Sequence, residues 1–411
     1  MTLPHTNRRR LAAFGVFTAS AMAAAMVGGP ASAAPATGGI LNANSATAVQ
    51  GSYIVVLKDS AVGGRAGTQE AAVASSARSL AGRYGATLGH VYGAALNGFE
   101  ARLPERAAKR LAADPSVAYV AQNQTVQATA TQTNPPWGLD RIDQPNRPLS
   151  ATYNYTTTGS GVTAYIIDTG IRTTHSQFGG RAVDGYDAVD GALPAADCNG
   201  HGTHVAGTVG GSTYGVAKGV RLIAVRVLDC NGSGTYAGVI AGVNWVTSHH
   251  AAGVPAVANM SLGGGFDASV NAAVANSIAD GVSYAIAAGN SGANACNYSP
   301  ASVATAVTVG ATDSVDARAS WSNYGTCLDI FAPGVNVLSA WYTSDTASNT
   351  ISGTSMASPH VAGVIARVLQ SNPSWSPATV ASHLTSTATL NLVTNPGAGS
   401  PNRLLYRSPA L

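Results

Sequence analysis

Short apolar runs alternate with Ala-rich stretches along the C-terminal two thirds of this 411-residue chain. Apolar runs of this length fit strands that are buried on both faces, and the Ala-rich stretches between them fit helices. This alternation predicts an α/β domain in which helices cover both faces of a mostly parallel sheet, a three-layer arrangement. The predicted strands are 162–167, 221–228, 256–260, 283–288 and 306–311, and the predicted helices are 201–209, 236–249, 270–279 and 355–370.

A smaller pattern precedes this domain. It consists of four apolar runs and two helical stretches, the second of which begins at Pro104 and ends before Asp114-Pro115. The order β-α-β-β-α-β predicts a small α+β unit of the ferredoxin-like type, an arrangement that by itself indicates no function. The predicted strands are 53–57, 88–92, 99–103 and 117–126, and the first helix is 68–84.

The first residues have the three parts of an export signal: a basic stretch at 8–10, an apolar stretch at 11–27 and the small residues Ala31-Ser32-Ala33. The apolar stretch is short, rich in Ala and Gly, and followed by Pro30, which argues against a membrane anchor. We therefore expect a secreted, extracellular protein, with general and twin-arginine export both open. The expected division is a signal peptide at 1–33, a linker at 34–50, a small domain at 51–129 and a large domain at 130–411.

Charge is sparse and unevenly distributed. Asp, Glu, Lys and Arg make up 10% of the chain, against roughly 25% in an average globular domain. Residues 130–411 hold 11 basic and 14 acidic residues, a net of −3, which leaves no basic patch for a nucleic acid. All three glutamates lie before residue 130. Any mechanism that needs a glutamate in the large domain is therefore excluded.

Four cysteines in an exported chain suggest two disulfides, and four cysteines allow three pairings. If the cysteines paired in sequence order, positions 198 and 230 would close a loop of 32 residues, and positions 296 and 327 a loop of 31. A zinc site is the alternative, but it would normally show close Cys-x-x-Cys pairs, which are absent.

Three short motifs carry the candidate chemistry: Asp168-Thr-Gly, His201-Gly-Thr-His204 and Gly-Thr-Ser355-Met-Ala. They supply a carboxylate, an imidazole and a hydroxyl, the groups that acyl transfer by an activated serine requires. Asp168 follows a predicted strand and Ser355 begins a predicted helix. The backbone N–H of Ser355 could therefore point toward a forming oxyanion.

Each motif has a competing interpretation. Asp168-Thr-Gly matches the turn of aspartic peptidases, but the chain has no second such turn. His201 and His204 could chelate zinc, but the glutamate base of that mechanism is missing; His204 is then a packed or hydrogen-bonded neighbour. The serine motif loosely resembles the nucleophile elbow of α/β-hydrolases, in which the order is Ser, Asp, His rather than Asp, His, Ser.

The order Asp168, His201, Ser355, together with the surrounding residues, closely resembles the subtilisin superfamily of serine peptidases and, within it, the proteinase K and aqualysin branch. The resemblance covers residues 137–408 and implies a subtilisin-like fold in which these three residues form the catalytic triad. The unit at about 51–128 resembles the inhibitory propeptide of the same superfamily. Asn290, in Ala-Ala-Gly-Asn, matches the side-chain donor to the oxyanion.

The resemblance also implies where a substrate would bind. Asn231-Gly-Ser-Gly234 and Ser261-Leu-Gly-Gly264 resemble two extended segments that sandwich a peptide as an added strand. The walls of the pocket, 287–289 and 298–301, contain no charged residue, so we expect apolar and aromatic side chains before the cleaved bond. The candidate substrate-binding residues are Ser233, Gly234, Tyr236, Ser261, Leu262, Gly263, Ala288 and Gly289.

The same resemblance implies the disulfides Cys198–Cys230 and Cys296–Cys327, and structural calcium. Asp329, with the carbonyls of Ala304 and Ala306, matches a calcium site of the family, and hard oxygen ligands suit that ion. Asp140, Asp143 and Gln144 could form a second site, although Ser150 and Thr152 stand where related proteins supply acids. No catalytic cofactor is expected.

We therefore expect a secreted serine endopeptidase of broad specificity, made as an autoprocessed zymogen whose mature part begins near Ala130. Its partners would be polypeptide substrates and its own propeptide, which acts as intramolecular chaperone and inhibitor; we expect a monomer that binds no nucleic acid. A catalytically inactive homologue and an esterase are the alternatives, to be separated by active-site labelling and by comparing peptide with ester substrates.

Overall fold

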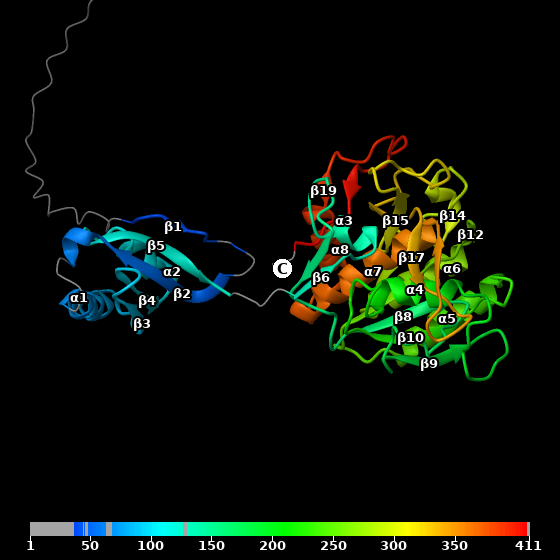
Figure 1. Cartoon of the computed structure of the whole chain (residues 1–411), viewed down its shortest axis with the longest axis horizontal. Helices are drawn as coiled ribbons and strands as arrows, with labels where there is room; N and C mark the ends of the chain where they lie inside the picture. The colour runs from blue at the N-terminus through cyan, green and yellow to red at the C-terminus, as the bar shows by residue number, and fades with distance from the viewer. Residues whose placement is uncertain (1–36, 44, 46–47, 63–67, 126–129, 409–411) are drawn as a thin grey trace, which may run out of the picture. The chain divides into compact units, whose positions relative to one another are not determined.

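The computed structural model describes residues 37–43, 45, 48–62, 68–125 and 130–408, so the expected signal peptide and the segment just before Ala130 lie outside the described residues. The chain divides into two compact units, Met1–Gln124 and Thr125–Leu411. Figure 1 shows a small sheet packed against helices in the first unit and a large sheet between layers of helices in the second. None of the described helices is both long and apolar enough to cross a membrane.

The N-terminal unit is the small α+β domain that the pattern predicts. Its five-stranded sheet has the order β1-β5-β2-β4-β3, antiparallel except for the pair β1 and β5. Fully buried residues such as Val55, Phe99 and Leu111 form one core between the sheet and the helices. The elements are β1 Ile40–Leu41, β2 Ala48–Leu57, α1 Thr68–Tyr84, β3 Thr87–Tyr92, β4 Gly98–Arg102, α2 Glu105–Leu111 and β5 Val117–Gln124, with a 3-10 turn at Asp59–Ala61.

The three glutamates of the chain all belong to this unit. Glu70 and Glu105 lie in the first turns of α1 and α2, where a negative charge is favourable to the helix dipole. Glu100 lies on β4 with 5% of its surface exposed and accepts hydrogen bonds from Ser52 Oγ at 3.0 Å and Arg102 Nε at 3.1 Å.

The C-terminal unit is built on a nine-stranded sheet, which confirms the predicted α/β class. The strand order is β19-β20-β16-β15-β13-β11-β8-β10-β9, and every neighbouring pair is parallel except β19 with β20. The strands are β8 Thr163–Asp168, β9 Ala182–Asp187, β10 Arg221–Arg226, β11 Ala256–Met260, β13 Ser283–Ala287, β15 Val307–Thr312, β16 Ile330–Pro333, β19 Thr389–Leu390 and β20 Arg403–Leu404.

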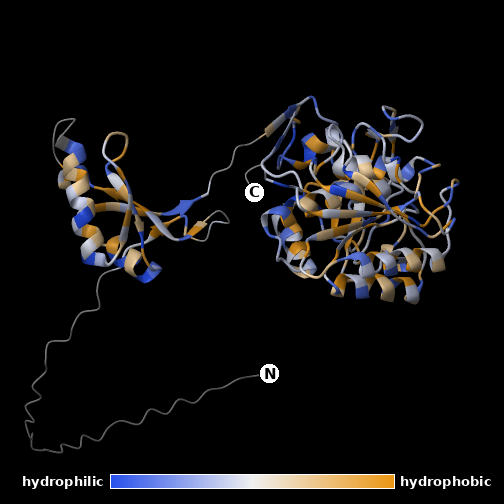
Figure 2. Ribbon diagram, turned by 90° about the horizontal axis from the view of Figure 1, so that it is seen from below, coloured by the Kyte–Doolittle hydropathy of each residue, from blue (hydrophilic) through white to orange (hydrophobic). Residues whose placement is uncertain are grey.

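Both faces of this sheet are buried. On β8, Ala164 and Ile166 belong to a core with the helices α4 and α7, whereas Tyr165 and Ile167 belong to a second core with α5 and α6. Figure 2 shows hydrophobic residues along the strands and polar residues on the outer sides of the helices. The helices are α3 Trp137–Ile142, α4 His201–Gly210, α5 Tyr236–His249, α6 Ala268–Ala279, α7 Thr354–Ser371 and α8 Pro377–Thr387.

Several elements were not predicted from the pattern. The edge strand β9 carries Asp184, Gly185 and Asp187, so it does not read as an apolar run. The helix α8 has a recognisable start, because Ser376 caps Thr379 N and Pro377 occupies the first turn. Also not predicted are β1, α3, β16, β19, β20 and the 3-10 turn at Asp59–Ala61. The remaining additions are the pairs β6 Ala130–Thr133 with β7 Thr152–Tyr155, β12 Gly264–Gly265 with β14 Tyr298–Ser299, and β17 Val337–Ala340 with β18 Ser348–Ile351, and a 3-10 turn at Ala295–Asn297.

Candidate active site

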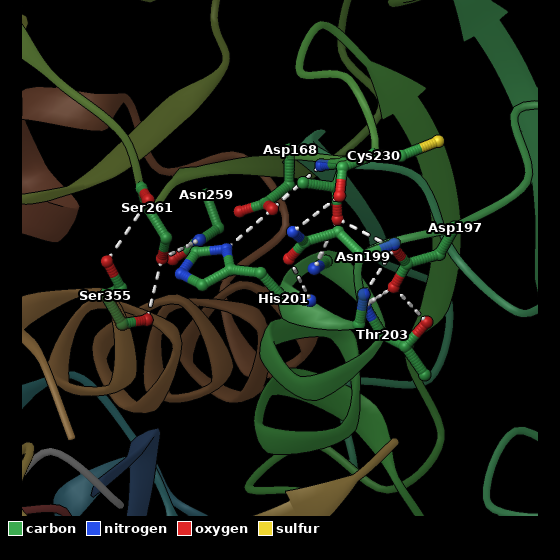
Figure 3. A network of polar contacts seen from close by, with 12 residues as sticks. Asp168, Asp197, Asn199, His201, Thr203, Cys230, Asn259, Ser261 and Ser355 are labelled. Atoms are coloured by element: carbon green, nitrogen blue, oxygen red, sulfur yellow. Dashed lines mark hydrogen bonds and ion pairs between the residues drawn. The ribbon is translucent and has the colours of Figure 1, made fainter. Parts of the chain in front are cut away.

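Asp168 is the last residue of β8, a strand that lies between β10 and β11, third from the β9 edge of the sheet. Its side chain is completely buried. Oδ1 accepts a hydrogen bond from Thr169 N at 2.8 Å and lies 2.7 Å from Nδ1 of His201 (Figure 3). Oδ2 is buried without a hydrogen-bond partner in the described part of the chain. The carboxylate therefore directs its strongest contact at one imidazole.

His201 is the first residue of α4, and 26% of its side-chain surface is exposed. Burial lowers the pKa of the imidazole, but the charge and hydrogen bond of Asp168 and the charge of Asp197 outweigh burial, so the pKa of His201 is raised above its ordinary value. An imidazole held by a carboxylate on Nδ1 presents Nε2 on its other side as an acceptor for a proton.

The first turn of α4 is capped by side chains from outside the helix. Gly200, immediately before the helix, has a φ of 108° and packs against the rings of Trp341 and Tyr342. The backbone N–H groups of the first three helical residues each donate to a side-chain oxygen, which satisfies donors that a helix start leaves free. These bonds are His201 N to Asn199 Oδ1 at 3.2 Å, Gly202 N to Thr169 Oγ1 at 2.9 Å and Thr203 N to Asp197 Oδ2 at 2.9 Å.

Ser355 is the second residue of α7, a helix whose interior contains Pro359. Because Pro359 has no N–H, the carbonyl of Ser355 lacks its usual partner four residues on. Ser261, just after β11, supplies it: its Oγ donates to Ser355 O at 2.8 Å. In return Ser355 Oγ donates to Ser261 O at 3.2 Å, so the two serines hold each other by reciprocal hydrogen bonds (Figure 3).

Asn290 follows β13 by three residues and faces the start of α7. Its Oδ1 accepts hydrogen bonds from Thr354 N at 2.9 Å and Thr354 Oγ1 at 2.8 Å. An amide has one oxygen and one NH₂ group, so this arrangement turns Nδ2 away from Thr354. Thr354 Oγ1 also accepts from Gly289 N at 3.1 Å, which joins the segment after β13 to the start of α7.

His201, Asn290 and Ser355 line one cleft of about 660 Å³, a volume in the range of ligand-binding pockets. All eight predicted substrate-binding residues line it, and no Asp, Glu, Lys or Arg does among the residues that the structure describes. Tyr236 closes one wall by donating from Oη to Gly265 O at 2.7 Å. A Cβ on Gly264 would lie 2.3 Å from that hydroxyl, so glycine permits the closure.

Two disulfides have the pairing that the resemblance implies, Cys198 with Cys230 and Cys296 with Cys327. The first joins the loop before His201 to the segment at 231–234. Asn199 reinforces the link, since its Nδ2 donates to Cys230 O at 3.0 Å. The loop that carries the imidazole is thereby tied to one wall of the cleft.

His204 makes contacts of its own, away from Asp168. It is fully buried, its Nε2 lies 3.0 Å from Val337 O, and burial lowers its pKa to about 3. The ring is therefore neutral and packed one turn below His201.

The residues considered for calcium lie outside the cleft. Asp329 Oδ2 accepts from Thr308 N at 2.8 Å, and burial raises the pKa of this carboxyl to about 6. Asp143 Oδ1 is buried and has no hydrogen-bond partner among the described residues, while its Oδ2 accepts from Asn154 N at 2.7 Å. A buried carboxylate oxygen without a donor fits a cation position. Asp140 is already engaged: Oδ1 accepts from Ser150 N and Oγ, and Oδ2 from Ala151 N.

The sequence analysis missed three residues that shape the site: Asp197, Thr169 and Thr354. Thr169 and Thr354 stand next to Asp168 and Ser355, so adjacency to a candidate catalytic residue was the available signal. Asp197 stands four residues before His201, and nothing in a single sequence distinguishes it from a loop aspartate at the surface.

Comparisons with known proteins show the family to which the chain belongs. The model of the subtilase family matches residues 159–404, and the model of the peptidase inhibitor I9 family matches residues 52–129. An extracellular serine proteinase of Thermus sp. (strain Rt41A) is 53% identical over 379 residues, which are 89% of this chain and 92% of that protein.

Two further relatives resemble narrower parts of the chain. An alkaline serine exoprotease A of Vibrio alginolyticus is 54% identical over 80% of this chain, which spans 61% of that protein. The crystal structure of a cold-adapted subtilisin-like serine proteinase aligns with a TM-score of 0.65 and 55% identity, and the alignment covers 68% of this chain and 99% of the other.

Proposed function

Because this chain belongs to the subtilase family of serine proteases, we propose that it is a secreted endopeptidase in which Asp168, His201 and Ser355 form the catalytic triad. One observation carries the proposal most: Asp168 Oδ1 lies 2.7 Å from His201 Nδ1, and both His201 and Ser355 line the same uncharged cleft. The names of the Thermus and Vibrio relatives, an extracellular proteinase and an exoprotease, support secretion.

Each group has a role that follows from its contacts. Ser355 Oγ attacks the carbonyl carbon of the peptide bond while His201 Nε2 takes its proton, and His201 later returns that proton to the leaving amine. Asp168 keeps the proton of the neutral ring on Nδ1 and stabilises the imidazolium. Water then hydrolyses the acyl-enzyme by the same steps, with His201 again acting as base and then as acid.

The oxyanion would be stabilised by Asn290 and by the N–H of Ser355. With Oδ1 held by Thr354, the Nδ2 group of Asn290 is available to donate to charge that develops on the carbonyl oxygen. Ser355 N lies in the first turn of α7, at the positive end of an 18-residue helix.

The substrate would bind as an extended strand between the segments 231–234 and 261–264. Main-chain hydrogen bonds recognise any extended polypeptide, so side-chain selection falls to the pocket walls. Ala287–Gly289 and Tyr298–Ala301 line the cleft without a charged residue, which favours apolar or aromatic side chains before the cleaved bond. A series of tetrapeptide substrates that differ only at that position should show the highest kcat/KM for Phe or Leu and the lowest for Glu.

The N-terminal unit would be an inhibitory propeptide, removed by self-cleavage before about Ala130. Residues 52–129 match a peptidase inhibitor family, and the net charge of residues 34–129, with 8 basic and 5 acidic residues, is opposite to the −3 of residues 130–411. Ser355→Ala should accumulate the uncut precursor in a protease-free host. Normal maturation of that variant would disprove self-cleavage.

Calcium would have a structural role. Asp329, with the carbonyls of Ala304 and Ala306, offers one site, and the unpartnered Asp143 Oδ1, with Asp140 and Gln144, offers a second. A chelator should lower the melting temperature of the inhibited enzyme, and added calcium should restore it. Comparing Asp329→Asn with Asp143→Asn shows which site causes the change in melting temperature. If the chelator does not change the melting temperature of the wild type, both sites are excluded.

A serine-directed fluorophosphonate tests the central proposal. The mature enzyme should hydrolyse casein, lose that activity on treatment and carry the label on Ser355. Processed protein that takes no label would instead be a catalytically inactive homologue. Ester hydrolysis without peptide hydrolysis would favour the esterase.

A further inference from the structure

Asp197 is a buried acid that the mechanism above does not use. Only 9% of its surface is exposed, and none of the described Lys or Arg side chains forms an ion pair with it. A buried carboxylate without a cation must be satisfied by hydrogen bonds. Asp197 receives five: Oδ1 from Thr169 Oγ1 at 2.9 Å, Asn199 N at 2.9 Å and Gly200 N at 2.8 Å, and Oδ2 from Thr203 N at 2.9 Å and Thr203 Oγ1 at 2.5 Å.

The donors lie on both sides of the Asp168–His201 hydrogen bond. Thr169 directly follows Asp168 at the end of β8, whereas Gly200 and Thr203 frame His201 at the start of α4. Figure 3 shows Asp197 beside Thr203 and Asn199, with His201 and Asp168 next to them. Thr169 Oγ1 also accepts from Gly202 N at 2.9 Å, so the hydroxyl bridges the carboxylate and the helix. One carboxylate thus holds the strand end and the helix start at a set separation.

We propose that Asp197 is a positioning residue, which holds the imidazole of His201 against Asp168 and adds a second negative charge behind the ring. The proposal rests on the assignment of Asp168 and His201 to the triad. Asp197 contacts neither the reacting atoms nor the substrate; it acts through Thr169 and the first turn of α4.

The charges that face His201 are few. Asp168 faces it from β8 and Asp197 from the loop before α4, and both favour the protonated ring. His204, on the next turn of α4, is neutral because burial lowers its pKa to about 3. Removal of the charge on Asp197 should therefore lower the pKa of His201, while Asp168 keeps the ring oriented.

The primary test is Asp197→Asn in the mature enzyme. Asparagine has the same shape as aspartate but carries no charge. Its NH₂ group must face either the N–H groups that now donate to Oδ1 or the N–H and hydroxyl of Thr203. We expect kcat to fall on the order of 10–100-fold, since small misplacements of catalytic groups have effects of this size. KM should change by less than threefold, because Asp197 does not line the cleft.

The pH profile is the measurement that a merely structural role would not alter. His201 must be neutral to accept the proton. As the pH is raised, kcat/KM of the wild type should therefore increase, with an inflection above pH 6.5. Asp197→Asn should move that inflection to lower pH. Thr169→Val breaks the bridge but keeps the charge, so it should lower kcat about tenfold and leave the inflection in place.

Asp313→Asn is the matched control, because Asp313 Oδ1 also accepts two backbone N–H groups, those of Val315 and Ala317 at 2.9 Å, in a loop away from the cleft. It should change neither kcat nor the inflection.

Should Asp197→Asn fail to fold, Thr169→Val decides the question. A kcat of Thr169→Val within twofold of the wild type overturns the proposal. An unshifted inflection in folded Asp197→Asn also overturns it. Wild-type enzyme that takes no fluorophosphonate label would refute the triad itself, a different result.

Discussion

The two helices that carry the imidazole and the hydroxyl begin in opposite ways. At the start of α4, each of the first three N–H groups donates to a side chain from outside the helix, those of Asn199, Thr169 and Asp197. At the start of α7, Thr354 N donates to Asn290, but the N–H of Ser355 has no side-chain partner among the described residues.

The difference follows from what each helix start has to do. The proposed base must stay in one place, and saturating the donors around His201 removes alternative positions for that turn. The helix of the proposed nucleophile instead keeps a donor free for a charge that would exist only during the reaction, where preorganised donors have their largest effect. Under the proposed mechanism, saturation serves orientation at α4, and incomplete saturation serves transition-state binding at α7.

The largest effect should come from the α7 side. Asn290→Ala removes the other proposed oxyanion donor, and kcat should fall about 10²–10³-fold with little change in KM. Steady-state kinetics on a peptide substrate measures both. Asn276→Ala, on the exposed side of α6, is the control and should behave as wild type. A loss smaller than threefold for Asn290→Ala would mean that the N–H of Ser355 suffices.

Removing each disulfide in turn distinguishes an effect on the stability of the domain from an effect on the orientation of α4. The loops they close are nearly equal, 32 and 31 residues, so removal of either should lower the free energy of unfolding by about 3–4 kcal/mol. Only the pair Cys198→Ser with Cys230→Ser should also lower kcat, because Cys198 stands between Asp197 and Asn199. Guanidinium unfolding of inhibited enzyme and kinetics on active enzyme measure the two effects; equal kinetics for both double variants would remove the link between this disulfide and α4.

Gly202 tests how closely α4 approaches the strand end. A Cβ at this position would lie 2.1 Å from Gly170 O, a contact with backbone that cannot move aside easily. Gly202→Ala should destabilise the enzyme by about 1–3 kcal/mol and lower kcat. Gly238→Ala, in the first turn of α5, meets ordinary contacts of 3.4 Å and should stabilise by about 0.5–1 kcal/mol. The midpoint of thermal unfolding measures the change in stability for both variants. If both variants raised the midpoint, or both lowered it, the close approach of α4 to the strand end would be contradicted.

The smallest effect should come from Ser261. Ser261→Ala leaves the carbonyl of Ser355 without the donor that replaces the missing N–H of Pro359, at a cost of about 1 kcal/mol in stability. Ser269→Ala, on the exposed start of α6, should be neutral in the same melting experiment. Identical melting temperatures for the two variants would show that the free carbonyl finds another partner.

Strand and helix positions in the large domain were predictable where apolar patterning is uninterrupted. Strand 256–260 and helix 236–249 agree with the structure residue for residue. Of the three motif residues, His201 and Ser355 line one cleft, and Asp168 lies buried behind His201 at 2.7 Å from its Nδ1. The edge strand β9 was not predictable in this way, because an edge position tolerates the polar residues that interrupt its pattern.

The supports of the site could not be predicted for a different reason. The bonds from Asp197 to Thr169 and from Ser261 to Ser355 join residues that are 28 and 94 positions apart, and no local pattern records such contacts. Pro359 signals that a carbonyl is left free, but not which segment supplies the donor. Motifs identify the reacting groups, and only tertiary packing identifies what orients them.

The confinement of glutamate to the N-terminal unit makes the two parts chemically separable. A glutamate-specific endoproteinase has its three cutting positions at Glu70, Glu105 and the buried Glu100, and none in residues 130–411. Limited digestion of the Ser355→Ala precursor should therefore cut within the N-terminal unit and leave the large domain whole, with residues 106–129 still attached. The amino-acid composition thus offers a way to remove most of the N-terminal unit without using the activity of the large domain.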